Sequence, residues 1–163
     1  MKHLTIINKN AGGYTPKEQR KLHEILSNVE GEILATPDLA TLEYQLQKHR
    51  DFNPDILGIG GGDGTASQTL TLVQKIWGHI PKYIAPYAMG TMNNWAFPFG
   101  LSDGIFDKMK QRTGIGDTKP VQLARYVRQL AESQEKPHTG ELALLDVNGR
   151  RGFNVGFGVT AKL

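Results

Sequence analysis

The chain has 163 residues, a formal net charge of +3 and no cysteine. This length suffices for one domain with its own core, or for one domain and part of another. The lack of cysteine excludes disulfides and thiolate metal sites. No apolar run approaches the ~20 residues that span a bilayer, and basic and acidic residues are interspersed rather than gathered in a nucleic-acid-binding stripe.

Strand-like and helix-like segments alternate regularly through the first half of the chain. The predicted strands are four short apolar runs, at residues 4–7, 33–36, 56–59 and 83–86. Such alternation predicts a mainly parallel sheet with helices on both faces, joined by right-handed crossovers. We therefore expect a three-layer α/β/α domain.

The segments between these strands carry the caps and apolar faces of helices. Thr15 is placed to cap the first helix, with Glu18 at the capping-box position, and Gly31 is predicted to end it. Asp38 is predicted to cap the second helix, which has one apolar face made of Leu39, Leu42 and Leu46. The third helix is expected over residues 66–77, with an inward face of Ala66, Leu70, Val73 and Trp77.

Beyond residue 99 the pattern changes. We expect a short helix at 103–111, a polar linker at 133–140, and a helix at 120–132 whose inward residues are Leu123, Val127, Leu130 and Ala131. Two more strands are predicted at 142–147 and 152–159, joined by Asn148-Gly149, which is a strong hairpin signal. An antiparallel hairpin after a parallel unit indicates that a second, β-rich domain begins, and the chain is expected to end before that domain buries anything.

The most informative stretch follows the third predicted strand, and it consists of Gly60, Gly61, Gly62, Asp63, Gly64 and Thr65. Glycines permit positive φ and present backbone amides to an anion, and the start of the next helix adds to this effect. A carboxylate here would repel a phosphate unless a cation lies between them, which favours Mg²⁺ bound by Asp63. The alternative is a tight turn in which Asp63 caps the helix. The stretch is neither a Walker A loop nor a G-x-G-x-x-G motif.

Two further polar loops follow neighbouring strands. Asn8 and Gly12 come after the first strand, and Gly90, Thr91 and Asn93 come after the fourth. Because the carboxyl ends of parallel strands share one edge of a sheet, we expect these loops to converge on the glycine stretch. Thr91 would donate to a phosphate, and Asn93 would bind a sugar hydroxyl or the backbone. The alternative for each loop is an ordinary turn or helix cap.

Other candidate chemistry is weaker. The five histidines show no ligand spacing, and no serine lies in a G-x-S-x-G elbow, so neither a metal centre nor a hydrolase triad is expected. Arg125 and Arg128 would share a helix surface, which either meets an anionic headgroup or is simply solvated. The mild positive charge allows a weak attraction to an anionic lipid surface.

In this order, the three loops resemble the catalytic domain of the diacylglycerol kinase and sphingosine kinase superfamily. Residues 8–12 are similar to its N-P-x-x-G, residues 61–65 to G-G-D-G-T, residues 90–94 to G-T-x-N-[DN], and residues 153–158 to F-x-N-x-x-x-G. The G-G-D-G-T element is shared with NAD kinases, whereas the run from Gly90 to Ala96 favours the lipid-kinase branch. Lys9 and Ala88 stand where the family usually has proline.

The resemblance implies an ATP-dependent lipid kinase that transfers the γ-phosphoryl group of Mg-ATP to the hydroxyl of a diacylglycerol-like or sphingoid lipid. It implies that Asp63 is catalytic and holds Mg²⁺, and that Thr65 and Thr91 donate to phosphates. It also implies a nucleotide site formed by Asn8, Gly12, Thr36, Gly60, Gly61, Gly62, Gly64, Thr65, Gly90, Thr91 and Asn93.

In this family a β-sandwich domain follows, which supplies much of the lipid pocket and, in bacterial members, the proposed general base. Residues 1–138 would then be the nucleotide-binding domain, and residues 139–163 the incomplete start of a lipid-binding domain that also mediates any oligomer. The chain alone would be catalytically incomplete, in a protein that is cytoplasmic or peripheral at a membrane. An NAD kinase-like or other small-molecule kinase, and a nucleotide-binding domain without catalysis, remain open.

Overall fold

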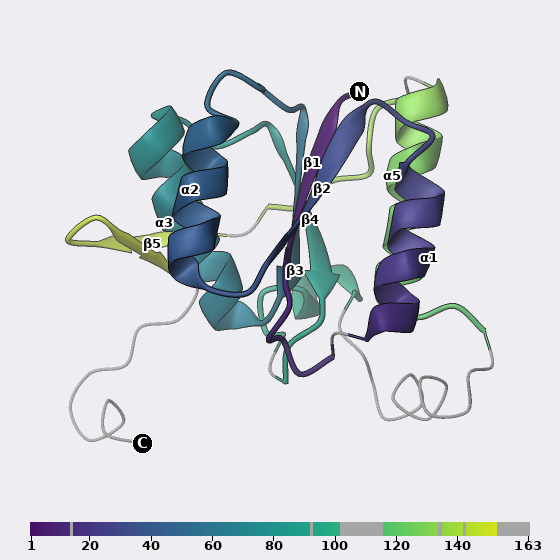
Figure 1. The fold of residues 1–163 in the computed structure, drawn as a ribbon, viewed down its shortest axis with the longest axis horizontal. Helices are drawn as coiled ribbons and strands as arrows, with labels where there is room; N and C mark the ends of the chain where they lie inside the picture. Colours follow the sequence, from purple (N-terminus) through teal and green to yellow (C-terminus); the bar gives the residue numbers. More distant parts are fainter. Residues whose placement is uncertain (14, 92, 102–115, 134, 142, 153–163) are drawn as a thin grey trace.

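The computed structural model describes residues 1–13, 15–91, 93–101, 116–133, 135–141 and 143–152. Its centre is a four-stranded parallel sheet with the strand order β2-β1-β3-β4. The strands are β1 (His3–Asn8), β2 (Gly31–Thr36), β3 (Ile56–Gly61) and β4 (Tyr83–Ala88). One helix pair covers each face (Figure 1), formed by α1 (Pro16–Leu26) with α5 (Lys119–Ser133), and by α2 (Leu39–Lys48) with α3 (Asp63–Trp77). The predicted three-layer α/β/α fold is confirmed.

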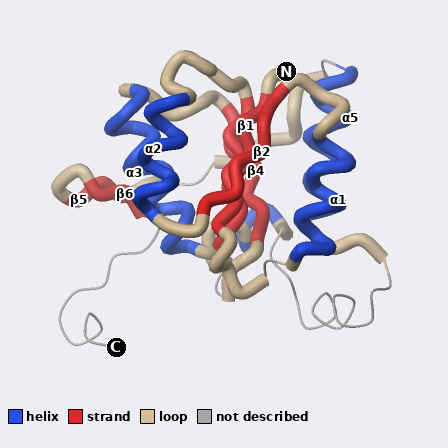
Figure 2. The backbone as a smooth tube through the Cα atoms, viewed as in Figure 1, coloured by secondary structure: helices blue, strands red, loops and turns tan. Residues whose placement is uncertain are grey.

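Both faces of the sheet are buried, because side chains alternate along each strand and helices lie on either side. Ile6 and Ile59 pack with α2 and α3, whereas Ile7, Ile56 and Tyr87 pack with α1 and α5. Figure 2 shows the strands stacked between the two helix pairs. The core therefore has two halves, and the loops at the sheet's ends stay on the surface.

The strand order creates a switch point between β1 and β3. From β1 the chain moves outward to β2 through α1, then returns through α2 to β3 on the other side and continues to β4. At such a point the loops that follow the two central strands lead away in opposite directions and leave a crevice at the carboxyl edge. The loops after Asn8 and Gly61 border that crevice.

Two predicted helix boundaries are wrong. The first helix ends at Leu26, where Ser27 is the C-cap, and Gly31 instead begins β2. Glycine is required in β2 instead, because φ of Gly31 is 157° and a Cβ there would lie 2.3 Å from the His3 ring on the neighbouring strand. The third helix begins at Asp63 rather than at residue 66.

The predicted N-caps are confirmed. The Thr15 hydroxyl accepts a hydrogen bond from the Glu18 amide at 3.2 Å, and the Asp38 carboxylate accepts one from the Thr41 amide at 2.7 Å. The predicted apolar face of α2 is partly wrong, because Leu42 and Leu46 are buried whereas Leu39 is 47% exposed. In α3 the predicted inward residues are buried or partly buried, and in α5 only Ala131 of the four is not buried.

The segment between α5 and the hairpin packs back on the domain. The His138 amide donates to the Tyr126 hydroxyl at 2.7 Å, and the two rings stack with centroids 6.4 Å apart.

The arginines predicted to share a surface of α5 form ion pairs, Arg125 with Asp117 and Arg128 with Glu132. The short helix predicted at 103–111 lies outside the described residues, and a 3₁₀ turn, Phe97–Phe99, precedes it.

The predicted hairpin is present, formed by β5 (Leu145–Val147) and β6 (Arg150–Gly152). Its turn residues Asn148 and Gly149 have φ values of 52° and 78°, as a type I′ turn requires. β5 begins at Leu145 rather than at residue 142, and β6 begins at Arg150 rather than at residue 152. Residues 153–159 of the second predicted strand lie outside the described part. β6 contacts α3, but every described residue from 139 to 152 is exposed or only partly buried. None of the helices in the described ranges combines the length and apolar composition needed to cross a membrane.

Candidate functional site

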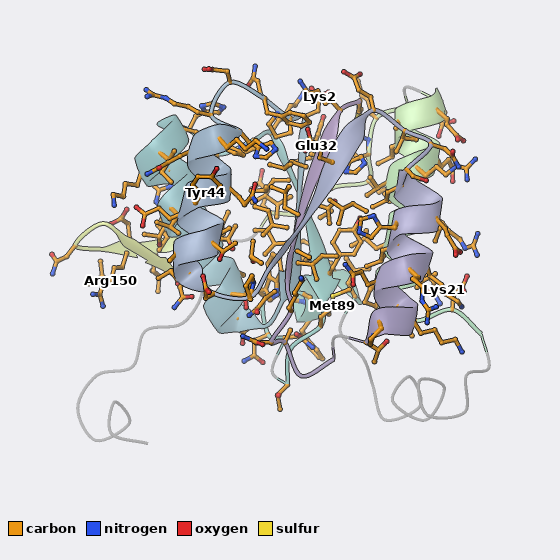
Figure 3. All side chains as sticks on the ribbon, in the orientation of Figure 1. Lys2, Lys21, Glu32, Tyr44, Met89 and Arg150 are labelled. Carbon is orange, nitrogen blue, oxygen red and sulfur yellow. The ribbon has the colours of Figure 1, made fainter. Side chains whose placement is uncertain are left out.

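The three polar loops are bonded to one another at the carboxyl edge of the sheet. The Asn8 side-chain amide donates to the Thr65 hydroxyl at 2.9 Å, which joins the loops after β1 and β3. The Trp95 amide donates to Asp63 Oδ1 at 3.1 Å, which joins the loops after β3 and β4. The amide of Gly13 donates to the Met89 carbonyl at 2.6 Å, which joins the loops after β1 and β4. Figure 3 places Met89 at this end of the sheet.

The glycine stretch is a strand-to-helix junction, and its glycines do not have the positive φ expected from the sequence. Positive φ occurs at several glycines in the described residues, but Gly60, Gly61, Gly62 and Gly64 are not among them. Two of the four are needed for close packing instead. A Cβ on Gly60 would lie 3.1 Å from the Met89 sulfur, and one on Gly61 would lie 2.5 Å from Cβ of Thr65. The expectation of positive φ in this stretch is therefore wrong.

The loop after β4 passes the glycine stretch in backbone contact. A Cβ on Gly90 would lie 2.2 Å from the Cα atom of Gly62, a distance that only a glycine avoids. A Cβ on Gly13 would lie 2.8 Å from the Met89 carbonyl oxygen, and one on Gly12 would lie 3.1 Å from the Thr91 hydroxyl. The converging loops leave no room for side chains between them, so their backbones form the floor of the site.

Gly64 is different, because a Cβ there would meet nothing within 4 Å. It lies in the first turn of α3, where backbone amides lack intrahelical partners, and Gly62 as N-cap offers no side-chain bond to satisfy them. Neither packing nor φ requires glycine at this position. An anion held by the first amides of α3 would require it, because a side chain at Gly64 would stand in the ligand's space.

Asp63 lies in this first turn and is half-buried. It is not the N-cap, so the alternative in which Asp63 caps the helix is wrong. Its Oδ1 is held by Trp95, which fixes the carboxylate at the mouth of the site. No group of three or more acidic, histidine or cysteine side chains able to hold a metal occurs in the described residues. One carboxylate nevertheless suits Mg²⁺, which takes one or two carboxylates and completes its shell with phosphates and water.

Asn93 closes the loop after β4. Its Oδ1 accepts from the Gly90 amide at 3.0 Å, and its Nδ2 donates to the Gly90 carbonyl at 2.9 Å. Of the two predicted uses of Asn93, the structure shows the backbone contact. Thr91 is exposed beside Gly12, with its hydroxyl available at the surface of the site.

A cavity of about 140 Å³ opens at the switch point. It brings together three predicted site residues from three elements, Asn8 at the end of β1, Thr36 at the end of β2 and Thr65 in α3. Its other lining residues, which we did not predict, are Asn10, Pro37, Asp38, Leu39, Leu42 and Gln68. Gly12, Gly90, Thr91 and Asn93 do not line it and lie on the side of the β4 loop.

Two of the residues missing from the prediction had a sequence signal. Asn10 lies inside the stretch similar to N-P-x-x-G, and its side chain donates to the Pro37 carbonyl at 2.6 Å. Asp38 was recognised only as a helix cap, and the Thr41 amide bonded to its carboxylate lowers the pKa of Asp38. Leu42 was predicted only as part of the apolar face of α2, and Gln68 had no signal in the sequence.

A larger cavity of about 720 Å³ runs along the outer edge of β4 and is mainly apolar. Its walls include Tyr83, Trp95, Val127 and His138, from β4, its following loop, α5 and the segment after α5. None of the predicted site residues lines it. No glycine and no Asp63 line the smaller cavity, but it shares Asn8 and Thr65 with the joined loops. The smaller cavity, with the glycine stretch next to it in sequence, is therefore the better candidate for phosphate chemistry.

The fold and the three joined loops define a three-layer α/β/α domain with a glycine-rich strand-to-helix junction at the carboxyl edge of its sheet. The chain belongs to the diacylglycerol kinase catalytic domain family, whose model matches residues 2–126. The resemblance inferred from the loop motifs is thereby confirmed. A comparison with curated proteins finds no match.

Two solved structures from Bacillus anthracis str. Sterne are similar in fold. One, described as a diacylglycerol kinase, is 19% identical with a TM-score of 0.63, over 92% of this chain and 48% of that chain. The other, described as a candidate diacylglycerol kinase, is 18% identical with the same TM-score of 0.63, over 92% of this chain and 47% of that one. This chain thus spans about half the length of the solved relatives it matches.

Proposed function

We propose that this chain is the nucleotide-binding part of an ATP-dependent lipid kinase, which transfers the γ-phosphoryl group of ATP to a lipid hydroxyl. Residues 1–138 bind the nucleotide, and residues from 139 onward begin the domain that holds the lipid. The acceptor is a diacylglycerol-like or sphingoid lipid met at a membrane surface. On its own, the chain binds nucleotide but lacks the acceptor side of the site.

One observation carries this proposal. Gly64 stands in the first turn of an uncapped helix, has nothing near the position of its missing Cβ, and lies between Asp63 and Thr65, which two other loops hold in place. A polyphosphate requires open space, backbone amides without partners, a fixed carboxylate and a fixed hydroxyl, and this position combines all four. Membership of the family points to the same chemistry.

We propose the following roles for the residues of the site. The first amides of α3 and the Thr65 and Thr91 hydroxyls bind phosphate oxygens, while Asn8 and Thr36 line the cavity for the nucleoside. Mg²⁺ bound by Asp63 would neutralise charge on the phosphates as transfer proceeds. The lipid oxygen forms its bond to phosphorus as the bond to the ADP oxygen breaks. The hydroxyl proton passes to a base on the acceptor domain.

The test uses the full-length protein that contains this chain. Radiolabelled ATP is supplied with a panel of diacylglycerols and sphingoid bases, and label is measured in the organic-extractable product. We expect label in at least one lipid, and a loss of about 10²-fold or more in kcat for Asp63→Asn, in which the side chain can still accept from Trp95 but carries no charge. Asp51→Asn is the matched control, because Asp51 is exposed and precedes β3, whereas the loops lie at the other end of that strand.

Three results would contradict the proposal. Label that enters only NAD or a soluble sugar would assign a small-molecule kinase. Nucleotide binding without transfer to any acceptor would assign a regulatory domain. Unchanged turnover in Asp63→Asn would remove that carboxylate from the mechanism.

A further inference from the structure

Three polar residues on one face of α3 contact a single residue of the β5–β6 hairpin. They are Ser67, Thr71 and Gln74, whose spacing of four and three residues places them on one side of a helix. We call them the α3 stripe. Ser67 Oγ donates to the backbone carbonyl of Arg151, and Thr71 Oγ1 accepts from the Arg151 amide at 2.9 Å. The Arg151 guanidinium donates through Nη1 to Gln74 Oε1 at 3.3 Å.

These three bonds hold Arg151 on the surface of α3. The helix satisfies both backbone polar groups of Arg151, so the hairpin cannot slide along α3 without losing both bonds. The Thr71 hydroxyl also donates to the Ser67 carbonyl at 2.8 Å, which leaves its lone pair directed at the Arg151 amide. Within the hairpin, Arg151 Nε contacts Asp146 Oδ2 at 3.3 Å and holds the guanidinium group in place. The contact therefore fixes the position of β6 along the helix.

The order of these bonds gives the direction of β6. The Arg151 amide lies at Thr71 and its carbonyl lies at Ser67, one helical turn closer to the N-terminus of α3. At Arg151 the chain therefore runs toward the end of α3 at which Asp63 and Thr65 stand. Figure 1 shows the hairpin outside α3, on the side away from the sheet, and Figure 3 shows Arg150 on this hairpin.

We propose that the α3 stripe fixes the position of the hairpin along α3, which we call the docking register. This position holds the acceptor side of the enzyme against the helix that binds the phosphates. Ser67 lies one helical turn beyond Asp63, and a helical turn is rigid, so a hairpin fixed at Ser67 and Thr71 is also fixed relative to the phosphates. Ser67 and Thr71 are positioning residues and touch no reactant. The consequence for catalysis rests on the proposed function, whereas docking is a property of this chain alone.

Docking is tested first, by amide hydrogen exchange at Arg151 measured by NMR on this chain. In the double variant Ser67→Ala/Thr71→Val, we expect exchange at Arg151 to rise about tenfold or more, because two hydrogen bonds to the helix are lost. The control Ser27→Ala removes a hydroxyl at the end of α1, on the opposite face of the sheet from α3, and leaves Arg151 unchanged. Ser67→Thr/Thr71→Ser keeps both hydroxyls and restores slow exchange. Fast exchange at Arg151 in the unsubstituted chain, or no change in the double variant, would overturn the register.

The catalytic consequence is tested in the full-length protein. We expect the double variant to bind ATP with the wild-type Kd, and to lose about tenfold in kcat/KM for the lipid acceptor. A nonspecific loss of structure would weaken both substrates together. Wild-type transfer in a variant whose Arg151 amide exchanges freely would overturn the positioning role. If the unsubstituted protein phosphorylates no lipid, the proposed function fails, and the exchange experiment still decides the register.

Discussion

The side-chain amide of Asn8 donates to the Thr65 hydroxyl at 2.9 Å, and this bond links the end of β1 to the first turn of α3 at the switch point of the sheet. Both residues line the small cavity there. Because the Thr65 oxygen accepts from Asn8, its own proton is directed away from that bond and can be donated to a ligand. Asn8 thereby orients Thr65, and the pair should act as a unit in nucleotide binding.

We expect Asn8→Ala and Thr65→Val to weaken nucleotide binding non-additively. Each change removes the same bond, so the coupling energy from a double-mutant cycle should be about 0.5–1.5 kcal/mol. Isothermal titration with ATP on the chain and its three variants measures this value. Asn28→Ala, at an exposed position after α1, is the control and should leave the Kd unchanged. Strictly additive losses would show that Asn8 acts without Thr65.

Gly64→Ala should raise stability while it lowers function. The position has no positive φ and no atom within 4 Å of an added Cβ, so alanine fits the helix without strain. Alanine in place of glycine in a helix should stabilise the fold by roughly 0.5–1 kcal/mol, measured by urea unfolding. The same methyl group would occupy phosphate space, and ATP affinity should fall about tenfold or more. A more stable variant that binds ATP normally would place the phosphates elsewhere.

Gly90→Ala should have the opposite effect on stability. An added Cβ would lie 2.2 Å from the Cα atom and 2.6 Å from the amide nitrogen of Gly62, and neither backbone atom can move without shifting β3 or α3. We expect a loss of about 3 kcal/mol in the free energy of unfolding. Gly100→Ala, where φ is 66° but a Cβ would meet nothing, controls for backbone strain and should cost less. Equal losses in the two variants would mean that crowding at Gly62 is not the cause.

Local signals explain why most of the fold could be predicted. The Thr15 and Asp38 caps and the Asn148-Gly149 turn each depend on neighbouring residues, and all three are as predicted. Alternation of strands and helices likewise depends on short-range pattern, and it led to the correct sheet. The convergence of the three loops followed from topology alone, because parallel strands end at one edge.

What could not be predicted depends on contacts between distant segments. Gly31 has the sequence signature of a helix C-cap, but the His3 ring on the adjacent strand decides its role. The glycine stretch suggested positive φ, but Gly60 instead packs against Met89 of another loop, and Gly61 packs against Thr65 in the first turn of α3. The contact between Gly90 and Gly62 joins residues 28 positions apart in the chain. The lining of the cavity by Gln68 required the orientation of α3. No local pattern carries such information.

His3 should make the stability of this chain depend on pH. Its side chain is 1% exposed, and burial lowers the pKa of His3 below the ordinary value of 6.5, because the charged imidazolium would lose its hydration. Thr5, whose hydroxyl lies 3.3 Å from His3 Nδ1, is the neutral neighbour on the same face. Burial also raises the pKa of Tyr87, which contacts the side chain of Thr5, so Tyr87 stays uncharged at neutral and acidic pH.

The sign follows from proton binding. Between the lowered pKa of the folded state and 6.5, the unfolded chain binds more protons at this histidine, so the free energy of unfolding falls as the pH falls through that window and is fully retained above it. Urea unfolding from about pH 7.5 down to about pH 5 should show this loss, with a slope of at most about 1.4 kcal/mol per pH unit from one group. In His3→Gln that part of the slope should disappear, whereas His79→Gln, which removes an exposed histidine, should keep it. A wild-type slope in His3→Gln would assign the pH dependence to other groups.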